Sequence, residues 1–134
     1  MNGIADTGFL VAFANAHDRH HKWAVSLAEQ VTEPLLTCES VLAESAFHLR
    51  SARTVLAMVR EGLVQIAFDC RDHAVQLEAL ALRYADRHPD LADLCLVRLS
   101  ELHPKLSVIT VDREDFKIYR RNKRDIIPII CPPA

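Results

Sequence analysis

Apolar residues along the chain fall into two patterns: short continuous runs, and longer stretches in which they recur every three or four positions. Continuous runs bounded by polar or turn-forming residues predict buried strands. They occupy residues 3–5, 35–37, 63–68, 106–111 and 126–130. The last run contains Pro128, which cannot donate a hydrogen bond to a neighbouring strand. We therefore expect this strand at an edge of its sheet or in an irregular segment.

Stretches with helical spacing predict helices between these strands. They cover residues 7–14, 23–31, 41–49, 55–61, 72–87 and 89–102. Thr7 and Thr37 stand where a hydroxyl can cap the helix that follows, and Gly62 stands where a glycine commonly ends one. Strands and helices are therefore expected to alternate along the chain.

This alternation decides the expected fold class. The chain has three glycines and no Asn-Gly or Asp-Gly pair that would indicate a tight hairpin. Helical crossovers join parallel strands, so we expect a three-layer α/β domain with a central parallel sheet flanked by helices. With 134 residues, 50% of them hydrophobic, the chain fits one domain, residues 1–134, that buries its own core.

The expected compartment follows from two absences and from the cysteines. No stretch approaches the roughly 20 apolar residues of a membrane helix, and the first residues do not resemble a signal peptide. We therefore expect a soluble, cytoplasmic protein without membrane contacts. The cysteines are not arranged in C-x-x-C pairs and have apolar neighbours, which predicts reduced core thiols. They are Cys38, Cys70, Cys95 and Cys131.

Four acidic residues stand where a charge needs an explanation. Asp6 and Asp112 each follow a predicted strand, at the carboxyl end where open α/β sheets bind ligands. Asp93 lies in a helix that is apolar on nearly every face, where an uncompensated carboxylate is costly. Glu44 lies at the border of an apolar helix stripe. Together they suggest one metal pocket.

Each of these carboxylates also has an ordinary structural role open to it. Asp6 and Asp112 could cap helices or form turns, and Asp93 could form a capping box with Asp90. Glu44 alone would be a solvated side chain. However, a fold that brings several carboxylates together usually holds a cation or shares a proton, because like charges repel. Oxygen ligands favour Mg²⁺ or Mn²⁺, the ions that serve phosphodiester hydrolysis.

The net charge of −2 gives no overall sign of nucleic-acid binding, but residues 113–124 are rich in lysine and arginine. A solvated basic helix is the ordinary interpretation of such a segment. Its position directly after Asp112 also favours contacts with nucleic-acid phosphates. The candidate residues for these contacts are Arg113, Lys117, Arg120 and Arg121.

Four segments carry a resemblance to a known family. They are Ile4-Ala5-Asp6-Thr7-Gly8, the helix with Val41-Leu42-Ala43-Glu44, Asp90-Leu91-Ala92-Asp93, and Thr110-Val111-Asp112-Arg113-Glu114-Asp115-Phe116. Together, and in this order over residues 3–131, they resemble the PIN-domain ribonucleases. In particular the chain resembles the VapC-type toxins of bacterial toxin–antitoxin pairs.

The resemblance implies a PIN-like fold and a Mg²⁺- or Mn²⁺-dependent endoribonuclease. The implied catalytic acids are Asp6, Glu44, Asp93 and Asp112, and the candidate metal ligands are Asp6, Asp93, Asp112 and Asp115. Thr7 would support this shell through its hydroxyl. Two choices stay open: Asp115 could replace or assist Asp112, and Asp90 could join Asp93 or only cap its helix.

The resemblance also implies partners: an RNA substrate, a cognate antitoxin protein and a second copy of the chain. The apolar helices within residues 23–58 could line a groove for an antitoxin segment, or could simply pack in the core. The histidines His17, His20 and His21 fall in a polar connector without matching ligands, which argues against a transition-metal site.

Two other functions compete with a nuclease. A receiver domain could use Asp69 as a phosphoacceptor, but it would need adjacent acids after the first strand, where Asp6 and Thr7 stand. A catalytically silent RNA-binding or interaction module could keep the same fold. No G-x-S-x-G motif and no glycine-rich phosphate loop is present, so a serine-hydrolase triad and a nucleotide-binding loop are not supported.

Overall fold

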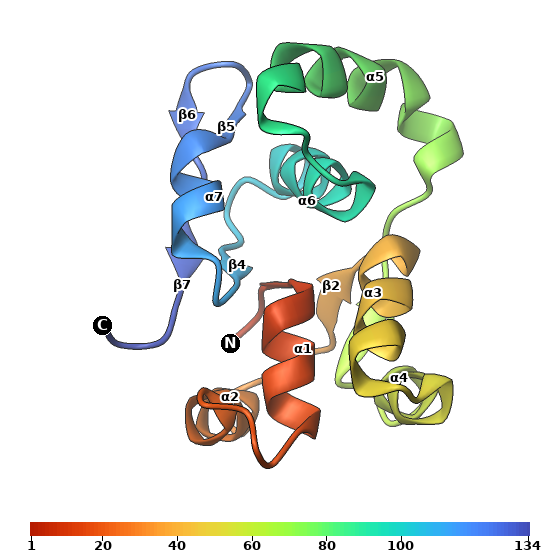
Figure 1. Cartoon of the computed structure of the whole chain (residues 1–134), viewed down its shortest axis with the longest axis vertical. Helices are drawn as coiled ribbons and strands as arrows, with labels where there is room; N and C mark the ends of the chain where they lie inside the picture. The colour runs from red at the N-terminus through yellow and green to blue at the C-terminus, as the bar shows by residue number, and fades with distance from the viewer.

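The computed structural model describes residues 1–134 and has a main sheet of five strands in the order β3-β2-β1-β4-β7 (Figure 1). All pairings in this sheet are parallel. The predicted α/β fold with a central parallel sheet flanked by helices is therefore confirmed. The strands are β1 (Ile4–Ala5), β2 (Leu35–Thr37), β3 (Val64–Ile66), β4 (Val108–Ile109) and β7 (Ile129–Ile130).

The strand order reverses between β1 and β4, the two central neighbours. Ile4 pairs with Val108 and Ala5 with Ile109, so both strands end at the same edge of the sheet. A crevice outside the carboxyl ends of two such strands is where open α/β sheets bind ligands. A receiver domain would have the order 2-1-3-4-5. The observed order, with β1 in the centre beside β2 and β4, is a different one.

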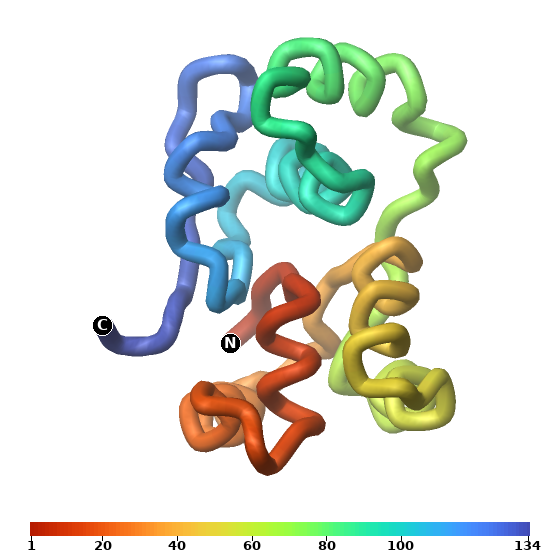
Figure 2. The backbone as a smooth tube through the Cα atoms, viewed as in Figure 1, coloured from red at the N-terminus to blue at the C-terminus, as the bar shows by residue number.

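Seven α-helices and two short 3₁₀ helices surround the sheet. The α-helices are α1 (Thr7–Ala14), α2 (His21–Ala28), α3 (Glu39–Leu49), α4 (Ala52–Arg60), α5 (Ala74–Arg83), α6 (Leu91–Leu102) and α7 (Arg113–Ile118). The 3₁₀ helices are η1 (Cys70–His73) and η2 (Ala85–Arg87). Helix α1 packs against α2 and α3, while α5 packs against α6. The tube in Figure 2 shows α5 at one end of the molecule and α2 and α4 at the other.

Helix α6 is the most enclosed helix, which explains why its sequence is apolar on nearly every face. It contacts α3, α5 and β1, so seven of its residues are buried, among them Leu96 and Leu99. In the other half of the molecule Phe9 is fully buried and meets the ring of Trp23 edge-on at 5.9 Å. This contact fixes α2 against α1.

The caps of two helices differ from the predicted ones. Asp6, not Thr7, caps α1, because its Oδ1 accepts a hydrogen bond from Thr7 N at 2.7 Å. Cys38, not Thr37, stands before α3, and the Thr37 hydroxyl instead donates to Ala5 O at 2.9 Å. Each strand runs into its helix without a connecting loop, so the threonines are enclosed by the sheet edge.

Two predicted helices are shorter than expected. Residues 72–87 form α5 with a 3₁₀ turn on either side, rather than one helix. The predicted basic helix over residues 113–124 is wrong beyond Ile118, where α7 ends. The chain then forms an antiparallel hairpin of β5 (Arg120–Arg121) and β6 (Asp125–Ile126).

The hairpin contradicts the expectation that the chain has no tight antiparallel connection. Its turn contains Asn122 and Lys123 with φ of 51° and 69°. Two consecutive positive φ angles are the requirement of a twisted hairpin turn, and asparagine tolerates this region better than most residues. The turn carries no Asn-Gly or Asp-Gly signal, because lysine rather than glycine stands at its second position.

The remaining expectations have mixed outcomes. Gly62, with φ of 85°, follows α4 as predicted. Strand β7 lies at a sheet edge, and Pro128 contributes its carbonyl as an acceptor for Val108 N. No helix of the chain is long and apolar enough to cross a membrane. All four cysteines are free, but Cys70 and Cys131 are only half-buried.

Candidate active site

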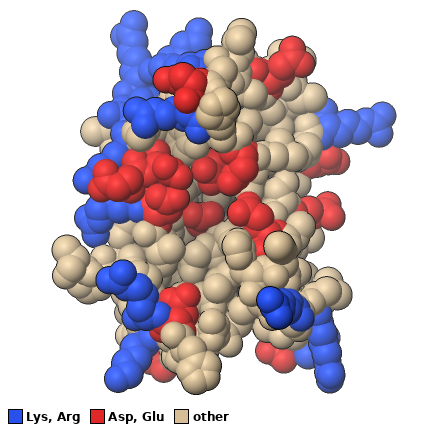
Figure 3. Space-filling model, viewed as in Figure 1, with Lys and Arg blue, Asp and Glu red and all other residues tan.

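A pocket of about 450 Å³ lies beyond the carboxyl ends of β1 and β4. Its lining contains no lysine or arginine. The acidic residues that line it are Asp6, Asp18, Glu44, Asp90, Asp93, Asp112 and Asp115. Every acid that the sequence assigned to the metal site thus reaches one pocket, and Figure 3 shows a band of acidic side chains across this face.

Asp6 is the most buried carboxylate of the pocket, with 7% of its surface exposed. Its Oδ1 accepts from Thr7 N, and its Oδ2 accepts from the Thr110 hydroxyl at 2.6 Å. Burial raises the pKa of Asp6 to about 6, although these two hydrogen bonds favour the ionised form. The negative charges of Asp112 and Asp90 raise this pKa further.

Thr110, the residue after β4, also organises the other side of the pocket. Its hydroxyl is fully buried and accepts a hydrogen bond from Asp112 N at 2.9 Å. One side chain therefore links the acid that follows β1 to the acid that follows β4. Since neither strand fixes this contact alone, the pairing of β1 with β4 is what brings the three residues together.

Asp93 is held by a contact that the capping-box interpretation does not include. Asp90 caps α6, its Oδ1 accepting from Asp93 N at 2.8 Å, but the Asp93 side chain does not reach back to it. Instead Asp93 Oδ2 accepts a hydrogen bond from the Tyr119 hydroxyl at 3.1 Å. Burial, followed by the charges of Asp90 and Asp6, raises the pKa of Asp93 to about 8.

Asp112 and Asp115 both line the pocket, so the structure does not choose between them. Asp112 is exposed and caps α7, its Oδ1 accepting from Asp115 N at 3.3 Å. Asp115 is half-buried, and its hydrogen bond with the Asp112 side chain is the main cause that raises its pKa to about 6. The two carboxyls therefore lie together at one rim of the pocket.

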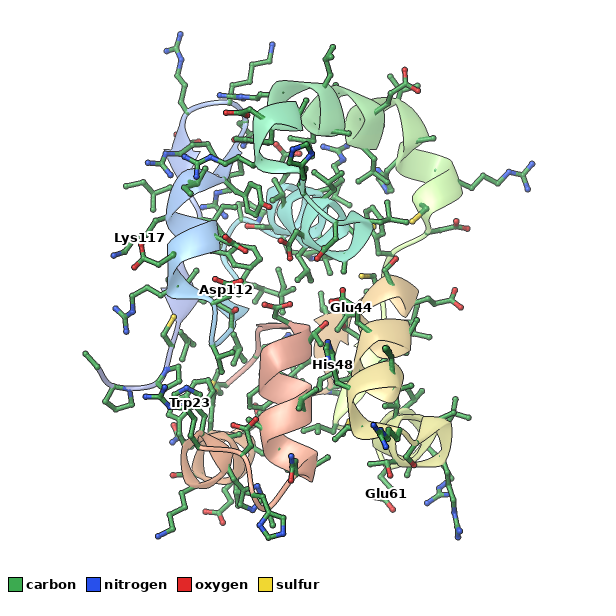
Figure 4. The ribbon with its side chains drawn as sticks, in the orientation of Figure 1. Trp23, Glu44, His48, Glu61, Asp112 and Lys117 are labelled. Atoms are coloured by element: carbon green, nitrogen blue, oxygen red, sulfur yellow. The ribbon has the colours of Figure 1, made fainter.

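Helix α3 supplies the opposite rim. Figure 4 shows Glu44 and His48, one turn apart on α3, directed toward the middle of the face, with Asp112 on the other side. Burial raises the pKa of Glu44, and the charges of Asp90 and Asp6 add to this effect. His48 lies in the pocket lining and is the only histidine there.

Comparison with known proteins identifies the fold family. The PIN domain family matches residues 4–122. The chain belongs to the PIN domain family. Members of this family are typically nucleases. No curated protein sequence matches the chain.

A solved structure similar to this PIN domain is that of VapC20 from Mycobacterium tuberculosis, a toxin that cleaves the sarcin–ricin loop. The two structures superpose with a TM-score of 0.67 and 20% sequence identity. The match covers 81% of this chain and 87% of the other. At this level of identity the likeness demonstrates a shared fold.

The donor set of the PIN domain fits a hard divalent cation such as Mg²⁺ or Mn²⁺. Seven carboxyl groups supply most of the ligand atoms in the lining, and the pKa values of Asp6 and Asp93 are raised by burial and by the neighbouring acids. The Thr7 hydroxyl is buried at the pocket and has no hydrogen-bond partner. No three acidic, histidine or cysteine side chains are already arranged to hold a metal ion. Mg²⁺ commonly needs only one or two carboxylates because it retains water ligands.

Four pocket features were not named as functional by the sequence. Thr110 stands in the quoted T-x-D segment, but nothing in that spacing predicts its contact with Asp6. Tyr119 carries no recognisable signal, since it stands between α7 and β5 and approaches Asp93 only because β5 packs against α6. Position 8 has no room for a side chain, because a Cβ on Gly8 would lie 2.3 Å from Val111 Cγ2. Asp18 lies in the loop before α2 and reaches the pocket across α1.

The four cations expected to bind phosphate lie outside the acidic pocket. Arg120 donates to the backbone carbonyls of Lys117 and Tyr119, and Arg121 donates to Ser100 O at 3.4 Å. Both arginines therefore hold the hairpin to its surroundings.

The other two expected cations are exposed. Lys117 pairs with Glu114 at 3.5 Å, extending away from the pocket, and Arg113 donates to Pro132 O at 3.1 Å (Figure 4). At the hairpin turn, Lys123 and Arg124 are exposed as well.

Proposed function

We propose that this PIN domain is a metal-dependent endoribonuclease that hydrolyses RNA phosphodiester bonds at the acidic pocket. One observation carries the proposal: Asp6, Glu44 and Asp93, from three separate elements, line the same pocket at the switch point of the sheet. Burial, together with the charges of the neighbouring acids, raises the pKa values of Asp6 and Asp93 and costs stability, which a bound divalent cation would offset. Membership of a family of nucleases supports the same reaction.

Asp6, Asp93, Asp112 and Asp115 are the proposed metal ligands, with Thr7 and Asp90 as accessory residues. When bound, Mg²⁺ or Mn²⁺ supplies positive charge for the scissile phosphate and makes water a stronger acid. Thr110 holds Asp6 in its ionised form by donating to Oδ2. The Tyr119 hydroxyl donates a hydrogen bond to Asp93 Oδ2 and so fixes the orientation of this carboxyl group. These two hydroxyls reduce the rearrangement that metal binding requires.

Glu44 is proposed as the acid that exchanges a proton with the reacting groups rather than as a principal metal ligand. It is half-buried and on the rim opposite Asp112 and Asp115. Because burial raises its pKa, it can exist in both protonation states closer to neutral pH than a solvated glutamate does. His48, one turn away, is the nearest group on α3 able to stabilise its charge.

The RNA backbone needs positive charge that the pocket itself lacks. Figure 3 shows lysine and arginine side chains gathered at the end of the face beside the acidic band. A second, smaller pocket of about 220 Å³ shares Asp90, Asp93 and Asp115 with the first and adds Arg87 and His88. RNA would thus be held by the hairpin and Arg87, with one phosphate over the acids.

The finer assignment is that of a toxin in a toxin–antitoxin pair, with an antitoxin and a second copy of the chain as partners. The similar fold of VapC20 supports it, as do apolar side chains that the chain leaves uncovered: Phe47 on α3 is 71% exposed and Leu56 on α4 is 64% exposed. Between α1 and α4 lies a groove of about 680 Å³ lined by Phe13 and Met58 among others. An antitoxin segment would cover this surface.

The deciding experiment is cleavage of a panel of structured and single-stranded RNAs with Mg²⁺, Mn²⁺ or chelator. We expect cleavage with either metal, none with chelator, and none by Asp93→Asn. The matched control is Asp72→Asn, because Asp72 is an exposed acid outside the pocket.

A catalytically silent RNA-binding module gives a different result. It would bind RNA without cutting it, and Asp93→Asn would bind as the unaltered chain does. Cleavage that persists in Asp93→Asn or in chelator would contradict the proposed site and its metal dependence. Equal loss in Asp72→Asn would indicate a general defect of the preparation.

A further inference from the structure

Outside the acidic pocket, cysteines from three separate parts of the sequence come together. Cys95 on α6 is at the centre of this thiol cluster, with its Sγ 3.5 Å from the Sγ of Cys70 at the start of η1. Cys38, which precedes α3, is also close enough to Cys95 for each thiol to shift the pKa of the other. The proposed nuclease reaction uses none of these thiols.

Among these contacts, the one between Cys70 and Cys95 suits a covalent bond. A disulfide has an S–S distance of about 2.05 Å, so the two sulfur atoms need to approach by only roughly 1.5 Å. Cys70 begins a 3₁₀ helix of four residues that follows a loop, whereas Cys95 lies within α6. The shorter segment can make most of this movement.

Exposure also distinguishes the three thiols. Cys38 is 1% exposed and Cys95 is fully buried, while Cys70 is half-buried. An oxidant in solution therefore reaches Cys70 first and finds Cys95 directly behind it. A bond between Cys38 and Cys95 would require the oxidant to enter the core.

We propose that Cys70 and Cys95 are a modification site that forms a reversible disulfide with a two-electron oxidant such as hydrogen peroxide. Peroxide oxidises the Cys70 thiol to a sulfenic acid and releases one water. The Cys95 sulfur then attacks the Cys70 sulfur, the S–S bond forms, the S–O bond breaks, and a second water leaves with the thiol proton. Two thiols are oxidised and one peroxide is reduced.

The rate of this reaction is limited by the protonation of Cys70. Burial raises the pKa of the Cys70 thiol to about 11, so the thiolate that reacts with peroxide is scarce near neutral pH. The disulfide is therefore expected to accumulate slowly during sustained exposure. A thiol reductant restores both cysteines.

The bond would tie the segment after β3 to the helix that carries Asp93. It would close a sequence separation of 25 residues. A closed loop lowers the conformational entropy of the unfolded chain, so the oxidised protein should melt at a higher temperature than the reduced protein. This shift should disappear when a dithiol reductant is added.

The test exposes the full reduced chain to hydrogen peroxide over a time course, alkylates the remaining thiols after denaturation and maps the peptides by mass spectrometry. We expect two alkylated cysteines instead of the four of the reduced protein. A peptide that joins Cys70 to Cys95 should appear and should be lost with dithiol. Four alkylated cysteines after long exposure would overturn the proposal.

Two variants keep the test specific. Cys70→Ser should prevent the link and the rise in melting temperature, and circular dichroism should show that it folds. Cys131→Ser should leave both unchanged, because Cys131 is equally half-buried but has Arg113 and Asp112 as charged neighbours rather than a thiol. Oxidation of Cys70 to a sulfinic acid without a link, or a bond between Cys38 and Cys95, would also contradict the pairing.

Discussion

Thr110 and Asp6 are 104 positions apart in the sequence, and the Thr110 hydroxyl donates a hydrogen bond of 2.6 Å to Asp6 Oδ2. The Thr110 hydroxyl oxygen also accepts a hydrogen bond from Asp112 N at 2.9 Å. Both groups are enclosed by the sheet edge, Thr110 completely and Asp6 almost so. The link therefore acts at once on the shape of the pocket and on the charge of its most buried acid.

Replacing Thr110 with valine should destabilise the protein, because it leaves Asp6 Oδ2 and the Asp112 N–H without their partner. Hydrogen bonds to charged groups contribute about 1.5–3 kcal/mol, so a loss of about 2 kcal/mol is expected at neutral pH. Urea unfolding at constant pH measures it. Thr110→Ser keeps the donor and should recover part of this loss. Unchanged stability in Thr110→Val would show that the hydroxyl does not stabilise the folded chain.

In the presence of chelator, the contribution of Asp93 to the free energy of unfolding should decrease as pH rises. The pKa of Asp93 is raised from 3.8 to about 8 in the folded chain. Between these two values the folded state binds more protons than the unfolded state, so the free energy of unfolding decreases with increasing pH. The contribution is fully lost above about pH 8.

The variant Asp93→Asn isolates this effect from that of other titrating groups. Its free energy of unfolding minus that of the unaltered chain should increase from about pH 4 to about pH 8 and then level off. Urea titrations at several pH values in chelator give this difference. A difference that is independent of pH would mean that Asp93 is ionised as easily in the folded chain as in the unfolded one.

Tyr119→Phe should weaken the site while leaving the fold intact. The ring of Tyr119 packs edge-on against Tyr84 at 5.1 Å and against Phe116 at 5.7 Å, and phenylalanine keeps these contacts. Only the donor to Asp93 is lost. Removing a residue that orients a metal ligand typically costs about 10–100-fold in metal affinity or activity. Calorimetric Mg²⁺ titration and RNA cleavage should both show the loss.

Tyr84→Phe is the matched control for that variant. Its hydroxyl accepts from Arg120 N at 2.9 Å and does not contact Asp93. We expect unchanged Mg²⁺ affinity in Tyr84→Phe together with a small loss of stability. If Tyr119→Phe bound Mg²⁺ as the unaltered chain does, Tyr119 would be a packing residue only.

The exposed cations of the hairpin turn should govern the salt dependence of RNA binding. The double variant Lys123→Gln, Arg124→Gln should weaken RNA binding. Each phosphate contact on a single strand contributes about 0.7 to the slope of log affinity against log salt concentration, so the loss of two contacts should reduce the steepness of this slope by roughly 1.4. The control is Arg53→Gln with Arg60→Gln, on α4 at the other end of the molecule. An unchanged slope in the hairpin variant would remove the turn from the RNA surface.

Arg120 and Arg121 behave differently in this comparison, although the sequence places them in the same basic segment. Their guanidinium groups donate to backbone carbonyls that hold the hairpin in place. Their replacement should therefore lower stability as well as RNA binding. Thermal melting separates the two effects.

The sequence predicted the α/β class because the period of its apolar residues changes with each element, and this is a local property. It also named the acids that reach the pocket apart from Asp18, since a carboxylate after a short apolar run, or inside an apolar helix such as that of Asp93, is conspicuous without any knowledge of packing. The hairpin after Ile118 was missed because its turn uses Asn122 and Lys123 at positive φ, which lysine rarely adopts.

Tertiary structure alone decided how these residues meet. The pairing of β1 with β4 brings Thr110 to Asp6, the packing of β5 on α6 brings Tyr119 to Asp93, and the approach of η1 to α6 brings Cys70 to Cys95. Periodicity and composition report which face of an element is buried, but not which distant side chain it is buried against. Hydrogen bonds, raised pKa values and thiol contacts depend on distances of a few ångströms, and only the packed chain sets those distances.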